Sequence, residues 1–251
     1  MSTPTTWWIP VRPEGTGYRG DARNYFAARG TTVTADIAPR LGADPWYGAA
    51  AGMIYAEETP EAALSGMPQE ARLIQLTGTP SAVDRGQAAL ASAVVGNEHP
   101  RSLAYGPSGA QIAELIESAR AISVDQVLSV AAELNKTKPL HWNAAWRGAW
   151  ELLPSKQCAL VLADVRAAAQ AGALAASRHD DRVLLNPVLR AAENAARALM
   201  VRHLIGAPKL KLKQAHYDAH TRVWRTVVGP LHPEDALSAT TSGERALLAA
   251  S

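Results

Sequence analysis

The sequence has only one cysteine, Cys158, among its 251 residues. A single cysteine excludes an intramolecular disulfide and argues against a cysteine-based metal site. The chain also lacks an uninterrupted run of about 18 apolar residues, the length that a membrane-spanning helix needs. Its N-terminus, Met1–Trp8, lacks the basic start and the apolar core of a secretory signal. These absences predict a cytoplasmic protein that does not enter a membrane.

Charged residues are also few, at 19% of the chain, and the net charge of +2 hides an asymmetry. Residues 1–100 contain seven arginines, no lysine and ten acidic residues, which gives a net charge of −3. Residues 101–251 contain twelve arginines, six lysines and thirteen acidic residues, which gives +5. A charge difference of this kind indicates two parts with different surfaces.

The first part, residues 1–100, is rich in Thr, Gly and Pro and contains short apolar runs. The runs 31–35 and 71–76 are typical of strands, and a turn follows the second run. A short helix is predicted over residues 59–64, because Thr59 can cap it and Pro60 suits its first position. We therefore predict a small mixed α/β domain over residues 1–100.

From residue 108 onward the apolar residues recur at helical spacing. The predicted fold class is therefore α+β, mainly α, with the small N-terminal domain followed by an α-helical bundle over residues 108–230. Asn186 and Pro187 are typical of a helix cap and first helical residue. The predicted helices cover residues 108–121, 123–137, the segment of Trp142 to Trp150, 155–177, 186–205 and 210–228. Residues 231–251 are predicted to form a weakly ordered tail.

Two sets of short motifs resemble known groups of proteins. The N-terminal set, which covers about the first 100 residues, is similar to a small uncharacterised domain of bacterial and phage proteins. It comprises Tyr18-Arg19-Gly20-Asp21, Ala28-Arg29-Gly30, Tyr55–Leu64 and Ala71–Leu76. The C-terminal set resembles the end of alanine-rich helical hypothetical proteins from high-GC bacteria. It comprises Ala198–Ile205, Tyr217 and Trp224. Neither resemblance implies an activity.

The N-terminal order of motifs also resembles the layout of the ADP-ribosyltransferase fold. In that fold an early Tyr-Arg places an arginine for NAD, a Ser-Thr-Ser strand supports the site, and a final glutamate polarises the ribose. Arg19 matches the arginine position, whereas Tyr55-Ala56-Glu57 stands at the place of Ser-Thr-Ser, and no Glu-x-Glu or Gln-x-Glu follows. The resemblance implies an NAD-binding domain centred on Arg19, and the absent motifs leave no residue to assign to catalysis.

Three tryptophans recur at a spacing of four residues, Trp142, Trp146 and Trp150, and make one stripe on a predicted helix. Such a stripe is typical of a core or of a contact between helices. The alternative is an interface with a partner, since tryptophan is favoured at the centres of protein interfaces. The pair Trp7-Trp8 near the N-terminus is a second candidate contact.

The segment 182–232 contains nine cationic residues against Glu193 and Asp218, a net charge of +7. Its alternating lysines and leucines, residues 209–213, would spread around a helix but would line one side of an extended loop. Such a cationic segment could bind phosphate backbones, with strong salt dependence. The alternative is a solvated face balanced by acids elsewhere. The candidate contacts to nucleic acid are Arg190, Arg197, Lys209, Lys211 and Lys213.

His216 and His220 are four residues apart on a predicted helix and could share one metal ion. A zinc protease motif would need a glutamate after the first histidine, and Tyr217 stands there instead. We therefore expect surface or capping histidines and predict no metal site.

Together these patterns favour a non-catalytic interaction or structural protein that acts through its helical part, as an oligomer or a phage-related component. A protein partner or self-association is expected, and no cofactor is. The first alternative is a nucleic-acid-associated accessory protein that uses residues 182–232. The second is an ADP-ribosyltransferase-like NAD-binding domain.

Overall fold

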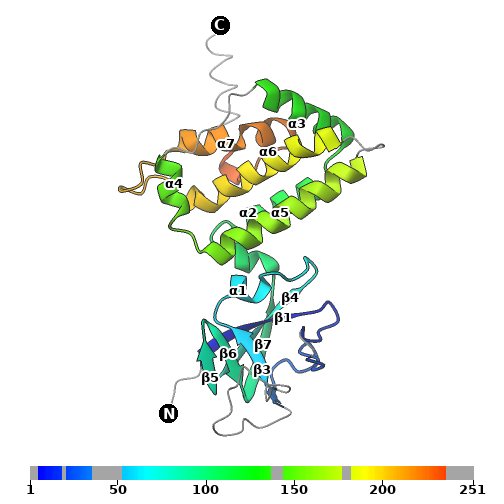
Figure 1. Ribbon diagram of the computed structural model, residues 1–251, viewed down its shortest axis with the longest axis vertical. Coiled ribbons are helices and arrows are strands. Elements are labelled where there is room, and N and C mark those ends of the chain that lie inside the picture. Colours follow the sequence, from blue (N-terminus) through cyan, green and yellow to red (C-terminus); the bar gives the residue numbers. More distant parts are fainter. Residues whose placement is uncertain (1–4, 19–20, 36–52, 137–143, 177–181, 236–251) are drawn as a thin grey trace. The chain divides into compact units, whose positions relative to one another are not determined.

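A computed structural model describes residues 5–18, 21–35, 53–136, 144–176 and 182–235 (Figure 1). The chain divides into two compact units, Met1–Ala104 and Tyr105–Ser251. The first contains an antiparallel sheet and the second contains helices, so the predicted class, α+β and mainly α, is confirmed. The boundary between the units, after Ala104, lies between the predicted end of the first part at residue 100 and the predicted start of the second at residue 108.

The described part of the N-terminal unit forms a seven-stranded sheet in which all pairs are antiparallel. Its strands are β1 (Thr5–Val11), β2 (Thr32–Thr34), β3 (Ile54–Glu57), β4 (Arg72–Gly78), β5 (Ala82–Asp84), β6 (Gln87–Leu90) and β7 (Ser92–His99). Their order is β2-β7-β4-β1-β3-β6-β5, which places β1 in the middle. The two strands and the helix predicted in this part correspond to β2, β4 and α1 (Pro60–Leu64). The Thr59 side chain accepts a hydrogen bond from the Ala62 N–H at 3.3 Å, so Thr59 is the helix cap.

An apolar core of this unit lies on one face of the sheet, and Leu73 and Ala89 are buried on the other face. Successive side chains of a strand point to opposite faces, so alternate residues of β1 enter the core and Trp8 points to the other face. Tyr25 joins the core from the segment between β1 and β2, and its hydroxyl donates to Asp21 at 2.5 Å. Burial, and then the bond to Asp21, raise the pKa of Tyr25. The core comprises Trp7, Ile9, Val11, Tyr25, Ile54, Ala56, Ile74, Leu76, Ala88, Leu90, Ala93 and Val95.

Helices form the described part of the second unit (Figure 1). They are α2 (Gly109–Arg120), α3 (Val124–Lys136), α4 (Ala144–Trp150), α5 (Ser155–Ala176), α6 (Arg182–Val201) and α7 (Gln214–Val227), with the 3₁₀ helix η2 (Arg202–Leu204) after α6. A further 3₁₀ helix, η1 (Arg101–Tyr105), spans the boundary between the two units in the sequence. Two predicted helix starts are wrong. α6 begins before Asn186, so Pro187 lies inside the helix. α7 begins at Gln214 and not at residue 210.

Pro187 costs α6 one backbone hydrogen bond, because proline has no N–H. The helix nevertheless continues through it, since α6 packs against α2, α3, α5 and α7 and buries an alanine-rich face. Tertiary packing of this kind supplies most of the stability of a helix in a protein. The local preference of Asn186 and Pro187 for a helix start was therefore overridden by the stabilisation that α6 gains from tertiary packing.

Small residues let the helices of this unit approach closely. A Cβ added at Gly172 of α5 would lie 2.1 Å from the carbonyl oxygen of Ala119 in α2.

The Tyr105 hydroxyl donates to Asp164 of α5 at 2.8 Å, so the buried carboxylate has a partner. Among the described helices, α5 alone is long and apolar enough to cross a membrane, and half of its apolar window is buried inside the unit.

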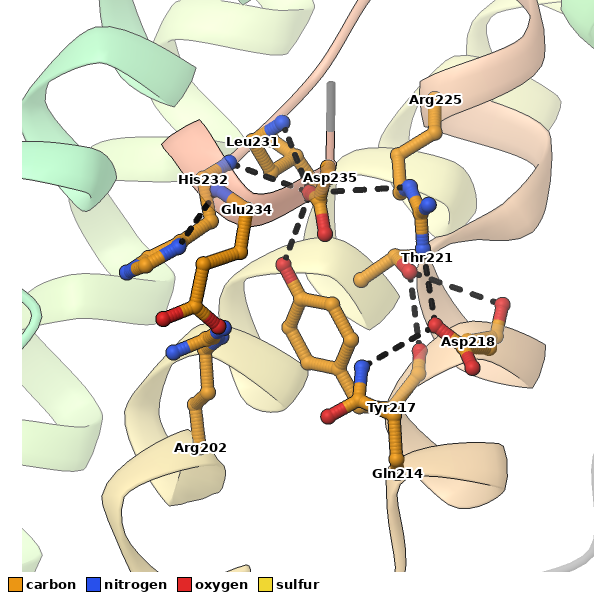
Figure 2. Close-up of polar contacts among 10 residues, drawn as sticks. All are labelled: Arg202, Gln214, Tyr217, Asp218, Thr221, Arg225, Leu231, His232, Glu234 and Asp235. Atoms are coloured by element: carbon orange, nitrogen blue, oxygen red, sulfur yellow. Dashed lines mark hydrogen bonds and ion pairs between the residues drawn. The ribbon is translucent and has the colours of Figure 1, made fainter. Parts of the chain in front are cut away.

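The chain after α7 is tied to the helical unit by a buried carboxylate, Asp235 (Figure 2). Asp235 accepts hydrogen bonds at 3.1 Å from the Tyr217 hydroxyl and from the N–H groups of Leu231 and His232. It also lies 3.5 Å from Arg225. The weakly ordered tail that we expected from residue 231 therefore does not begin there, and residues 236–251 of that prediction lie outside the described residues.

Candidate functional site

Three of the chain's six lysines lie in the loop between η2 and α7, residues 206–213, which we call the lysine loop. The Gly206 N–H donates to the Leu212 carbonyl at 3.1 Å and closes the loop. Inside it, the Leu210 N–H donates to the Ala207 carbonyl at 3.1 Å and makes a tight turn. The segment therefore has the loop conformation that the sequence left open, instead of the predicted helix.

Lysine and leucine side chains of this loop have opposite surroundings. Leu212 is 2% exposed, so it belongs to the core of the helical unit. Leu210 is half-buried and packs on α4, where its Cδ2 lies 3.6 Å from the position of a Cβ added at Gly148. The leucines anchor the loop, and Lys209, Lys211 and Lys213 are each exposed.

Lys211 has a backbone φ of +54°, in the left-handed region that favours glycine. An L residue costs about 1 kcal/mol or more in this region, because its Cβ approaches the following carbonyl oxygen. Arg85 is the other non-glycine residue with positive φ in the described chain, and it lies in the tight turn between β5 and β6. Residues in such conformations occur in tight turns, as Arg85 does, and at binding sites.

Three arginines of the basic segment are neutralised by acidic side chains. On α6, Arg197 lies 2.9 Å from Glu193, one turn earlier. Arg202 lies 2.6 Å from Glu234, and Arg225 lies 2.9 Å from Asp218 (Figure 2). Within the described chain, no acidic side chain lies at ion-pair distance from Lys209, Lys211, Lys213, Arg190 or Arg222. Three of these five cations lie within the short lysine loop, whereas Arg190 lies on α6 and Arg222 on α7.

The structure brings together three of the five residues that we predicted as nucleic-acid contacts, namely Lys209, Lys211 and Lys213. Arg190 is exposed on α6 but belongs to another element. Arg197 is half-buried in its ion pair, so its charge is compensated. The lysine loop is thus a smaller and more compact cationic surface than the segment 182–232 predicted.

The two histidines of α7 have different roles. His216 caps the helix, because its Nδ1 accepts the N–H of Lys213 at 2.9 Å. His220 is 6% exposed, its Nδ1 has no hydrogen-bond partner, and its ring lies 4.2 Å from that of Trp146 in an edge-to-face arrangement. Burial, and then the charges of Arg197 and His216, lower the pKa of His220 to about 4. The expected capping applies to His216, and His220 is a core residue instead.

The tryptophan stripe does not form one exposed surface in the described chain. Trp146 is 1% exposed and lies in the core of the helical unit, where it contacts His220. Trp150 is half-buried, and Trp142 lies outside the described residues. Trp146 therefore stabilises the fold and does not offer its ring to a partner.

The described residues contain no arrangement that we can assign to catalysis. No group of three or more His, Cys, Asp or Glu side chains among them could hold a metal ion. Burial raises the pKa of the Cys158 thiol, which disfavours the nucleophilic thiolate. Arg19 lies outside the described residues, so the NAD-binding hypothesis stays a prediction.

No protein family, curated protein or solved structure matches this chain.

Proposed function

We propose that this chain is a non-catalytic, cytoplasmic interaction protein whose helical unit binds the phosphate backbone of nucleic acid through the lysine loop. The observation that carries the proposal is the free charge of three exposed lysines, Lys209, Lys211 and Lys213, gathered in one short loop that is anchored by leucines. The positive backbone φ of Lys211 is consistent with it, because residues in such conformations occur at binding sites as well as in turns.

The expected binding is independent of sequence and sensitive to salt. Each phosphate that a lysine neutralises on a DNA duplex releases counterions and contributes about −0.9 to the slope of log K against log salt. Three contacts give a slope of about −2.7, so a fourfold rise in salt weakens binding about 40-fold. Lysine acts as a point charge on phosphate and reads no base, so one duplex sequence is expected to bind as well as another.

The test compares two variants of equal net charge, with a fluorescein-labelled DNA duplex of 20 base pairs followed by anisotropy. One variant replaces Lys209, Lys211 and Lys213 by glutamine. The matched control replaces three exposed cations of the helical unit that lie outside the loop by glutamine. They are Arg120, Lys136 and Lys156. We expect the loop variant to lose most of its affinity and salt slope and the control to keep both. Equal losses in the two variants, or no binding by the wild-type protein, would refute the proposal.

Self-association is a second candidate, because Val124 and Leu128 are exposed on α3. They are four residues apart and therefore lie on one face of the helix, where a second copy could cover them. Light scattering at low and high salt tests this candidate. A dimer that persists at high salt and dissociates when Leu128 is replaced by lysine would support it, and a monomer under all conditions would exclude it.

A further inference from the structure

A row of polar and aromatic side chains crosses the face of the N-terminal sheet that lies opposite the core. Trp8 of β1 pairs with Glu57 of β3 on one side and with Gln75 of β4 on the other, and Glu57 pairs with Gln87 of β6. Directly paired residues of antiparallel strands project to the same face, with Cβ atoms about 4.5–5.5 Å apart. Four adjacent strands therefore present one continuous row, and His99 of β7 extends it. We call Gln87, Glu57, Trp8, Gln75 and His99 the polar row.

Contacts within the row hold its side chains in place. The Gln87 amide donates to Glu57 Oε1 at 2.7 Å. His99 Nε2 and Gln75 Oε1 share a hydrogen bond of 3.1 Å, and the His99 ring lies 5.2 Å from that of Trp8 at an interplanar angle of 76°. All five residues are half-buried, so each keeps part of its surface open. Within the described chain, the second carboxylate oxygen of Glu57 has no partner.

We propose that the polar row binds an arginine side chain of a basic segment in a partner protein. A guanidinium group can stack on the indole of Trp8 and donate to the open oxygen of Glu57, which is the cross-strand neighbour of Trp8. Arginine fits better than lysine, because its planar group stacks on a ring while its N–H groups reach a carboxylate beside that ring.

The charge around the row fits such a partner. Asp84 of β5 pairs with Gln87, so a second, exposed carboxylate lies at the end of the row. The row contains no arginine or lysine, and residues 1–100 carry a net charge of −3. Complementary charge of this kind steers a basic partner toward the surface and raises its association rate.

The experiment uses the full chain and three blocked peptides, Ac-Gly-Arg-Gly-NH2 and its citrulline and lysine counterparts. The indole N–H signal of Trp8, assigned with the variant Trp8→Phe, is followed by NMR during titration. Citrulline has nearly the shape of arginine but no charge. We expect a saturable shift with the arginine peptide, a weaker one with lysine and none with citrulline. We also expect Glu57→Gln to weaken arginine binding at least threefold and Glu70→Gln, an exposed acid outside the row, to leave it unchanged.

Three results would overturn the proposal. The first is an equal response to the citrulline peptide, which would show that charge has no part. The second is an unchanged affinity in Glu57→Gln. The third is a shift of the Trp8 signal with guanosine and none with the arginine peptide, which would make the row a nucleobase surface. If Trp8→Phe failed to fold, the Glu57→Gln and Glu70→Gln pair would still decide, since both change a partly or fully exposed carboxylate.

Discussion

Removal of the titrating group at residue 220 is expected to make the helical unit more resistant to acid. The pKa of His220 is about 4 in the folded protein, whereas an unperturbed histidine has a pKa of about 6.5. As the pH falls, the unfolded chain therefore binds the proton first, and the free energy of unfolding decreases between about pH 6.5 and pH 4. The difference of the two pKa values corresponds to about 3 kcal/mol, which is a large part of the stability of a typical domain.

The cause of this cost is the surroundings of His220. Its ring is buried beside Trp146, its Nδ1 has no hydrogen-bond partner, and the groups whose charges act on it, Arg197 and His216, are cationic when protonated. A proton on Nδ1 would therefore be desolvated without gaining a hydrogen bond or an opposite charge. The described contacts offer this imidazolium no compensation apart from the edge-to-face contact with Trp146.

The assay is urea denaturation of the wild-type protein and of His220→Phe at pH 7, 6, 5 and 4, followed by far-UV circular dichroism. Phenylalanine keeps a ring against Trp146 and cannot bind a proton. The difference in unfolding free energy between the two proteins removes the contributions that both proteins share. We expect this difference to move by about 3 kcal/mol in favour of the variant from pH 7 to pH 4. A difference that stays constant over this range would refute the reasoning.

Four further predictions concern single contacts, and each is checked by urea denaturation. Lys211→Gly should raise the unfolding free energy by about 1 kcal/mol, because glycine suits the positive φ. The same variant should bind DNA more weakly, because it loses the charge of Lys211. A variant that binds as well as the wild-type protein would contradict the proposed function. Trp146→Ala should cost about 3–5 kcal/mol and Trp150→Ala less, because only the first ring is fully buried; equal costs would contradict this. Gly172→Ala should cost about 1–3 kcal/mol, since the added Cβ would collide with the backbone of α2. Asp235→Ala should cost about 3 kcal/mol or more, because a hydroxyl and two N–H groups lose their acceptor; a loss under 1 kcal/mol would show that water replaces it.

Elements with strong local signals were predictable from the sequence. Thr59 and Pro60 indicated the start of α1, and the structure shows the capping bond. Turn residues and apolar runs likewise indicated β2 and β4. The strands β5 (Ala-Val-Asp) and β6 (Gln-Ala-Ala-Leu) lacked such a signal, because each is short and the alanines and the aspartate have little preference for strands.

The alternation of lysine and leucine in the lysine loop was visible in the sequence, but it did not determine whether the segment is a helix or a loop. Alternation of lysine and leucine in residues 209–213 is compatible with a helix and with an extended segment. The loop conformation depends on burial of Leu212 and on the bond between Gly206 and Leu212, both of which require the folded helical unit. The neutralisation of Arg202 was equally hidden, since its partner Glu234 is 32 residues away in the sequence. Charge counted along the sequence therefore overestimated the size of the cationic surface.

The polar row was predictable only in part, for a reason that is general to antiparallel sheets. The alternation in β1 assigns Trp7 and Trp8 to opposite faces, so one of the two tryptophans had to leave the core. Which residues flank Trp8 depends on the register of β1 against β3 and β4, strands that lie about 50 and 70 residues away. A shift of one residue in the β1–β3 register would place Ala56 or Glu58, and not Glu57, beside the indole. The juxtaposition of a ring and a carboxylate is thus a property of strand pairing, and the arginine titration tests that register as well as the binding.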